Sequence, residues 1–102
     1  MTKRYQIALS SPLGERRGTL LLLLQEDDGA VTGTISLLNA DNPVTGRRDG
    51  DTVYLTHHLR TLLNQLSCTT ELHLSGDAVT GVTRVGNMAA MALRGTELPP
   101  EQ

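Results

Sequence analysis

Three histidines and one cysteine are the side chains of this chain best suited to metal or thiol chemistry. His57 and His58 are adjacent, so in a strand they point to opposite sides of the sheet and cannot share one ion. His57 faces Cys68 if the intervening segment folds as a hairpin, but two ligands are fewer than the three or four that zinc requires. His73 falls on the opposite face. We therefore expect no metal site and no cofactor, and a buried His57 hydrogen-bonded to Thr70 or to the backbone.

Covalent catalysis by Cys68 would need His57 as a base and a third group to orient that base. No carboxylate falls on the same face of the expected sheet. Most carboxylates lie in turn segments, where they act as solvated turn formers: Glu26, Asp27, Asp28, Asp49, Asp51 and Asp77. The sequence also lacks a nucleophile-elbow pattern and a glycine-rich phosphate loop. We therefore expect no catalytic residue and a non-enzymatic protein.

Turn-forming segments recur at short intervals and separate stretches that favour β-structure. These turns are SPLG (11–14), EDDG (26–29), NADNP (39–43), RDGD (48–51), SGD (75–77) and VGN (85–87). The predicted strands lie near 4–10, 16–26, 29–38, 43–48, 51–60, 66–75, 77–84 and 88–96. Eight strands joined by hairpins can close into an up-and-down barrel, which removes exposed edges. The length fits one domain, so we predict a single all-β antiparallel barrel over residues 1–102.

One segment also fits a helix. Four leucines are spaced i, i+3, i+4 and i+7, as on one helical face: Leu59, Leu62, Leu63 and Leu66. The alternative fold therefore has fewer strands and a short helix at about 56–66. We favour two strands joined by a turn at Asn64-Gln65, because the VYLT segment (53–56) has high β-propensity.

Alternation along each strand assigns an inner and an outer face. Aliphatic positions such as Leu20, Leu22 and Leu24 share the inner face with His57, Cys68 and Thr70. Because the chain has no Phe and no Trp, the barrel either packs tightly or keeps a cavity. Such a cavity would suit a small apolar or amphipathic anionic ligand. We expect it to bind near His57, Cys68 and Thr70 and to enter past a basic mouth formed by Arg16, Arg60 and Arg84.

The outer face suggests a protein interface. If Leu20 and Leu22 point inward, Leu21 and Leu23 point outward, beside Ala8 of the first strand. The last strand would add Met88, Ala90 and Ala92 to one uncharged stripe. Monomers rarely expose large apolar patches. We therefore expect a homodimer, or a partner protein, on the stripe of Ala8, Leu21, Leu23, Ala90 and Ala92.

Composition limits the other partners. The net charge of −2 disfavours nucleic acid, whose phosphates favour a strongly basic face. Tyr5 and Tyr54 are the only aromatic residues, so few rings are offered for base stacking. One cysteine cannot form an internal disulfide, the longest apolar run (20–24) is far shorter than a membrane helix, and the N-terminal segment lacks an apolar signal core. We expect a soluble cytoplasmic protein with no nucleic-acid or membrane partner.

Several turn motifs together carry a family resemblance. They are Ser11-Pro12-Leu13-Gly14, Gly18-Thr19-Leu20, Val31-Thr32-Gly33-Thr34 after an acidic turn, Asn42-Pro43-Val44-Thr45-Gly46, Asp49-Gly50-Asp51, and the late Gly81 and Gly95. In these motifs the chain resembles a group of uncharacterised bacterial proteins of similar length. It departs from them in the fifth strand, where Val53, Leu55 and His57 replace the Phe and Gly they tend to have. The resemblance implies a compact barrel of calycin-like type and carries no activity.

Overall fold

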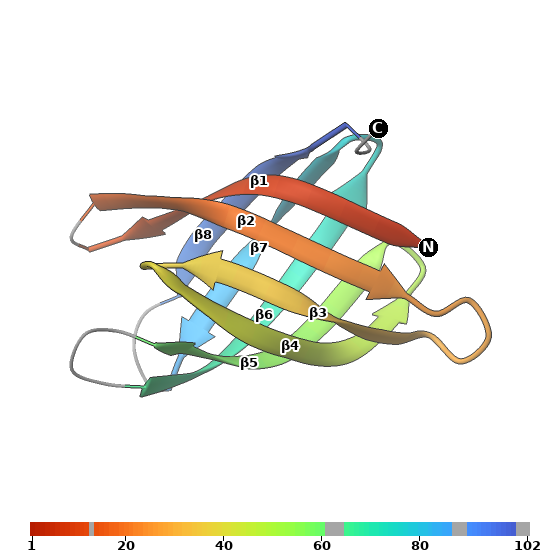
Figure 1. The fold of residues 1–102 in the computed structure, drawn as a ribbon, viewed down its shortest axis with the longest axis horizontal. Coiled ribbons are helices and arrows are strands. Elements are labelled where there is room, and N and C mark those ends of the chain that lie inside the picture. Colours follow the sequence, from red (N-terminus) through yellow and green to blue (C-terminus); the bar gives the residue numbers. More distant parts are fainter. Residues whose placement is uncertain (13, 61–64, 87–89, 100–102) are drawn as a thin grey trace.

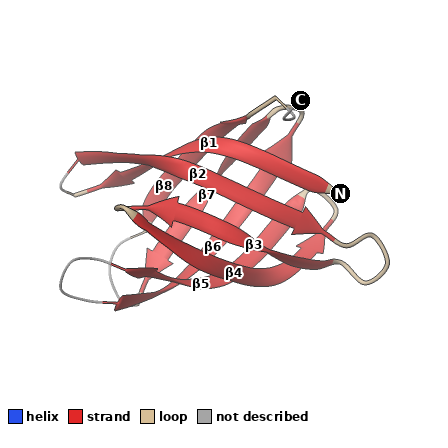
Figure 2. Ribbon diagram, viewed as in Figure 1, coloured by secondary structure: helices blue, strands red, loops and turns tan. Residues whose placement is uncertain are grey.

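The computed structural model describes residues 1–12, 14–60, 65–86 and 90–99 of the chain. Its strands are β1 (Thr2–Ser11), β2 (Gly14–Leu24), β3 (Ala30–Leu37), β4 (Ala40–Asp49), β5 (Thr52–Arg60), β6 (Gln65–Ser75), β7 (Ala78–Val85) and β8 (Met91–Glu97). Each strand pairs antiparallel with the next, and β8 pairs with β1, so the sheet closes (Figure 1). The described elements are all strands (Figure 2), and among them is no helix that could span a membrane. The predicted all-β, eight-stranded, up-and-down barrel is confirmed.

The alternative of a helix at about 56–66 is wrong for the described part of that segment. β5 continues to Arg60, and β6 begins at Gln65, which pairs with Arg60. The first and last leucines of the helix-like pattern, Leu59 and Leu66, lie opposite each other on the two strands of this hairpin. Their spacing therefore reflects strand pairing and not one face of a helix. Residues 61–64, including Asn64 of the expected turn, lie outside the described residues.

One turn lies earlier than expected. The NADNP segment (39–43) was expected to be a turn, but β4 already begins at Ala40, which pairs with Leu37. Leu38 and Asn39 both have positive φ angles, 57° and 62°, which is the geometry of a two-residue hairpin turn. Because two residues complete this turn, the following residues, including Pro43, belong to a strand.

The inner face of the sheet forms the core, as strand alternation predicts. Leu20, Leu22 and Leu24 are buried, and so are His57 and Thr70. The structure adds inward residues that were not assigned from the sequence: Tyr5, Asn42, Val44, Leu59, Thr83 and Val85. Tyr5 alternates in phase with Ile7, so the signal for its burial was present in the pattern.

Glycines within the strands allow the sheet to coil. A Cβ built on Gly46 would lie 1.7 Å from the carbonyl oxygen of Tyr54, and one on Gly81 would lie 2.0 Å from that of Glu71. Only glycine permits neighbouring strands to approach so closely. Both contacts lie in the β4–β7 wall of the barrel.

The up-and-down order places alternate turns at the same end of the barrel. The β2–β3, β4–β5 and β6–β7 turns share one end with the start of β1 and the end of β8 (Figure 1). The termini are held together there, because the Leu98 N–H donates to the Arg4 carbonyl oxygen at 2.7 Å and the Lys3 Nζ lies 3.4 Å from Glu97 Oε1. Six acidic residues of the turns gather at this end: Glu26, Asp27, Asp28, Asp49, Asp51 and Asp77.

Candidate functional site

A chain of hydrogen bonds crosses the interior from β5 to β7. His57 Nε2 lies 2.7 Å from Thr70 Oγ1, which lies 2.9 Å from Thr83 Oγ1. His57 Nδ1 lies 3.3 Å from the backbone carbonyl oxygen of His58, which can only accept, so Nδ1 carries the proton. Nε2 of the neutral ring then accepts from Thr70, and Thr70 accepts from Thr83. This arrangement uses both ring nitrogens within the protein, which indicates a structural role.

The electrostatics of the interior support that reading. Burial lowers the pKa of His57, an effect that the hydrogen bond to the His58 backbone partly opposes. Burial raises the pKa of the Cys68 thiol, partly opposed by a backbone hydrogen bond involving Leu59. Cys68 is free and buried. Its thiol therefore stays protonated near neutral pH and lacks the thiolate character that a nucleophile requires.

The residues expected to form an inner ligand site are only partly brought together. His57 and Cys68 lie directly opposite each other, and Thr70 is hydrogen-bonded to His57. Arg16 pairs with the inward-facing Leu9 near the β1–β2 turn. Arg60 is exposed at the end of β5. Arg84 instead lies on the outer wall, opposite Thr69. The expected entry past these arginines stays a prediction.

The residues expected to form the interface lie on the outer surface but not in one uncharged stripe. Ala8 pairs with Arg17 on one side and with Arg94 on the other. Leu21 lies beside Arg4. The expected continuity was wrong because the register places these arginines between the apolar positions.

The remaining members of that set are dispersed. Leu23 is 39% exposed, and its partner on the neighbouring strand β3 is the polar residue Thr32. Ala90 and Ala92 are exposed, and Ala92 pairs with Val82 of β7. Met88 lies outside the described residues.

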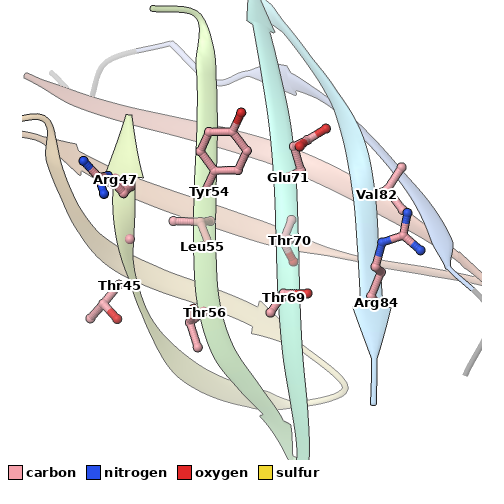
Figure 3. A pocket seen from close by; sticks show the side chains of 11 residues that line it. Thr45, Arg47, Tyr54, Leu55, Thr56, Thr69, Thr70, Glu71, Val82 and Arg84 are labelled. Atoms are coloured by element: carbon pink, nitrogen blue, oxygen red, sulfur yellow. The ribbon is translucent and has the colours of Figure 1, made fainter. Parts of the chain in front are cut away.

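A hollow of about 700 Å³ lies on the outer wall over β4–β7 and is open to solvent (Figure 3). Thr45, Thr56 and Thr69 lie side by side across β4, β5 and β6. The adjacent row places Tyr54 between Arg47 and Glu71. Tyr54 is 45% exposed. An exposed aromatic ring therefore stands beside a row of hydroxyl groups in one groove, which we call the β4–β7 groove.

Two arginines flank this groove. Figure 3 shows Arg47 on β4 and Arg84 on β7 at opposite sides, with Tyr54 and Glu71 between them. Within the described ranges, neither guanidinium group has a hydrogen bond or ion pair. Glu71 Oε2 lies 3.3 Å from His73 Nε2 on the exposed surface. The lining thus offers the guanidinium groups of Arg47 and Arg84, which are unpaired among the described residues, and the carboxylate of Glu71, which already contacts His73.

Sequence reasoning missed the β4–β7 groove although strand alternation points its side chains outward. Arg47 and Tyr54 were not selected because neither belongs to a motif. Their proximity to Glu71 and Arg84 depends on the pairing of four strands, which alternation within one strand does not specify.

A smaller hollow of about 360 Å³ lies around Ala8, where β1, β7 and β8 meet. Its two arginines are already engaged, because Glu15 accepts hydrogen bonds from Arg94 and, at 3.2 Å, from Arg17 Nε. These two bonds, that of Arg94 first, lower the pKa of the Glu15 carboxyl. This hollow therefore has less unpaired charge to offer a partner than the β4–β7 groove.

The fold and the site together define a closed, eight-stranded, up-and-down barrel with a basic-edged groove on its outer wall. The described ranges bring together no three His, Cys, Asp or Glu side chains able to hold a metal ion. Comparison of the chain with protein-family models, curated proteins and solved structures finds no match.

Proposed function

We propose that this protein is a non-enzymatic binding module that docks on a partner protein through the β4–β7 groove. The observation that carries the proposal is the exposed ring of Tyr54 between the unpaired guanidinium groups of Arg47 and Arg84. The segment of the partner that enters the groove carries acidic residues.

The chemistry of the lining supports this class of partner. Tyrosine and arginine contribute disproportionately to protein interfaces, because the ring buries a large area and guanidinium groups bind carboxylates with two parallel hydrogen bonds. The hydroxyl groups of Thr45, Thr56 and Thr69 can donate to or accept from a backbone. The groove therefore suits an extended, acidic polypeptide segment.

The interior is less suited to be the binding site. His57 and Thr70 are committed to each other and to their neighbours, and Cys68 is packed in the core. A small ligand held inside the barrel would have to displace these contacts. We therefore assign the binding role to the outer wall.

Two finer features complete the proposal. A calycin-like type is supported by the meander in which every strand neighbours the next and the last neighbours the first. A cytoplasmic location is supported by Cys68, which is free and buried, as suits a reducing compartment.

Selection from a random peptide library displayed on phage tests the proposed function. The wild-type protein and a Tyr54→Ala, Arg84→Ala double variant are panned in parallel. We expect peptides enriched in Asp and Glu that bind the wild type at least about tenfold more tightly than the double variant, since loss of aromatic and charged anchors costs more than about 1.4 kcal/mol.

The control is Leu23→Ala, which removes an exposed apolar side chain outside the β4–β7 groove. It should bind the selected peptides as the wild type does. Peptides that bind the double variant as tightly as the wild type, or a selection that yields no acidic enrichment, would contradict the proposal.

A further inference from the structure

We infer that the acidic segment entering the β4–β7 groove is the β2–β3 loop of a second copy of this chain. The inference rests on the proposed function and specifies its partner. It combines two features of the same molecule that lie on different surfaces, one at the end of the barrel and one on its side (Figures 1 and 3).

The β2–β3 loop presents carboxylates on a fixed base. The Gln25 N–H donates to the Ala30 carbonyl oxygen at 2.9 Å, and Asp28 Oδ1 accepts from the Ala30 N–H at 2.9 Å. Both bonds close the base of the loop. The side chains of Glu26 and Asp27 are exposed and have no hydrogen bond or ion pair with any other residue of the described chain. They are therefore available to a partner.

The charges of the loop and the groove are complementary. The tip offers Glu26 and Asp27, and the groove offers Arg47 and Arg84. The long arginine side chains can converge from opposite sides of the groove on one acidic tip. Glu71, whose Oε2 lies 3.3 Å from His73 Nε2, opposes the approach of carboxylates, so the two arginines must outweigh one like charge.

The relative placement of the two surfaces predicts the mode of assembly. Because the loop at the end of one copy occupies the groove on the side of the next, the contact joins two different surfaces of the chain, and such a heterologous contact builds rings or open filaments. Association therefore continues past two copies, unlike a two-fold dimer.

Sedimentation of the full chain at low salt gives the first test. The average mass should rise past twice that of the monomer between about 10 μM and about 1 mM, a range typical of small interfaces. It should fall again with added salt, which screens exposed charges. A wild type that stays monomeric throughout overturns this inference, while the peptide selection still tests the proposed function.

Charge reversal gives the second test. A groove variant carries Arg47→Glu and Arg84→Glu, and a loop variant carries Glu26→Lys and Asp27→Lys. Asp28 is kept because it closes the loop base. Each variant alone should associate at least about tenfold more weakly than the wild type, since like charges now meet. An equimolar mixture, in which each loop again meets a groove of opposite charge, should regain association.

Two controls separate this mode from general charge effects. Glu71→Gln should strengthen association severalfold, because it removes the carboxylate inside the groove, whereas Asp77→Asn at the same acidic end should change it little. Circular dichroism should show that all variants keep the β-sheet spectrum. If the mixture stays monomeric, or if both single-surface variants assemble as the wild type does, the loop is not the occupant.

Discussion

The Tyr5 hydroxyl group lies inside the barrel without a hydrogen-bond partner among the described residues. The side chain is 0% exposed, and burial, with a smaller contribution from Glu97, raises the pKa of the phenol, while Arg48 lowers it. Because the chain has no Phe and no Trp, the ring of Tyr5 fills core space that other proteins fill with those side chains. The ring therefore stabilises the core, while the hydroxyl adds a desolvation cost.

Replacing Tyr5 by Phe should raise the free energy of unfolding by about 1 kcal/mol, because it removes an unpaired buried hydroxyl and keeps the ring. Urea unfolding measures the change. Tyr54→Phe is the matched control, since Tyr54 is exposed, and should leave stability within about 0.5 kcal/mol. A clear loss of stability in Tyr5→Phe would show that the hydroxyl has a favourable contact.

His57 makes stability depend on pH. Its pKa in the folded protein lies below the ordinary value of 6.5, so the unfolded chain binds the proton first as the pH falls. The contribution of neutral His57 to stability is therefore complete above about pH 6.5 and is lost as the pH falls from there toward the folded pKa.

Unfolding in urea at a series of pH values should show this loss for the wild type, and His57→Gln should have a flatter profile between pH 5 and 7. The carboxylate Glu15, with its lowered pKa, affects stability only at more acidic pH. Proton NMR of the His57 ring should give a midpoint below 6.5. A midpoint at or above that value would show that the ring is not held neutral by burial.

At the scale of the strand, two glycines of β4 and its following turn have different roles. A Cβ at position 46 would lie 1.7 Å from the Tyr54 carbonyl oxygen. Any other residue at this position would therefore push β4 away from β5. Gly50 has a φ of 61° in the β4–β5 turn and open space around it. The first glycine is required by close packing and the second by backbone conformation.

Gly46→Ala should therefore destabilise the protein by about 3 kcal/mol or more, since the backbone must move. Gly50→Ala should cost only about 1 kcal/mol, the strain of a left-handed alanine. Thermal unfolding compares the two variants. Equal effects would contradict the close approach of β4 and β5.

At the scale of the whole molecule, the pairing of β8 with β1 closes the sheet. The pairs run from Tyr5 opposite Glu97 to Leu9 opposite Leu93. The start of β1 and the end of β8 lie at one end of the barrel, and the β4–β5 turn lies at that end as well. The positions of the termini therefore follow from where the meander begins rather than from any special feature of β1.

A circular permutant that joins the termini through a short glycine–serine linker and opens the chain at Gly50 should keep the barrel. Termini that lie close together tolerate this change, so stability should stay within about 2 kcal/mol of the wild type. The control opens the chain between Thr56 and His57, inside a central strand, and should not fold. If the Gly50 permutant loses cooperative unfolding, the β1–β8 closure is wrong.

The sequence by itself determined most of the residues that face the core, although it left six inward residues unassigned, among them Asn42 in the segment expected to be a turn. Alternation depends only on neighbours in the chain, and the phase of Leu20 to Leu24 and of Val53 to His57 is clear from side-chain type. The pairing of His57 with Cys68 followed from the symmetry of one hairpin. Local turn chemistry likewise predicted the number of strands.

Only the tertiary structure decided which outward residues are neighbours. Arg17 and Arg94 flank Ala8, and Tyr54 stands between Arg47 and Glu71, because of the register of successive strands and the closure of β8 on β1. The length of each turn sets the register of the two strands that it joins, and one residue more or less would shift that register. The turn at Leu38-Asn39, which has two residues, is an example. The surface of a barrel thus depends on contacts between distant residues, whereas its core pattern is local.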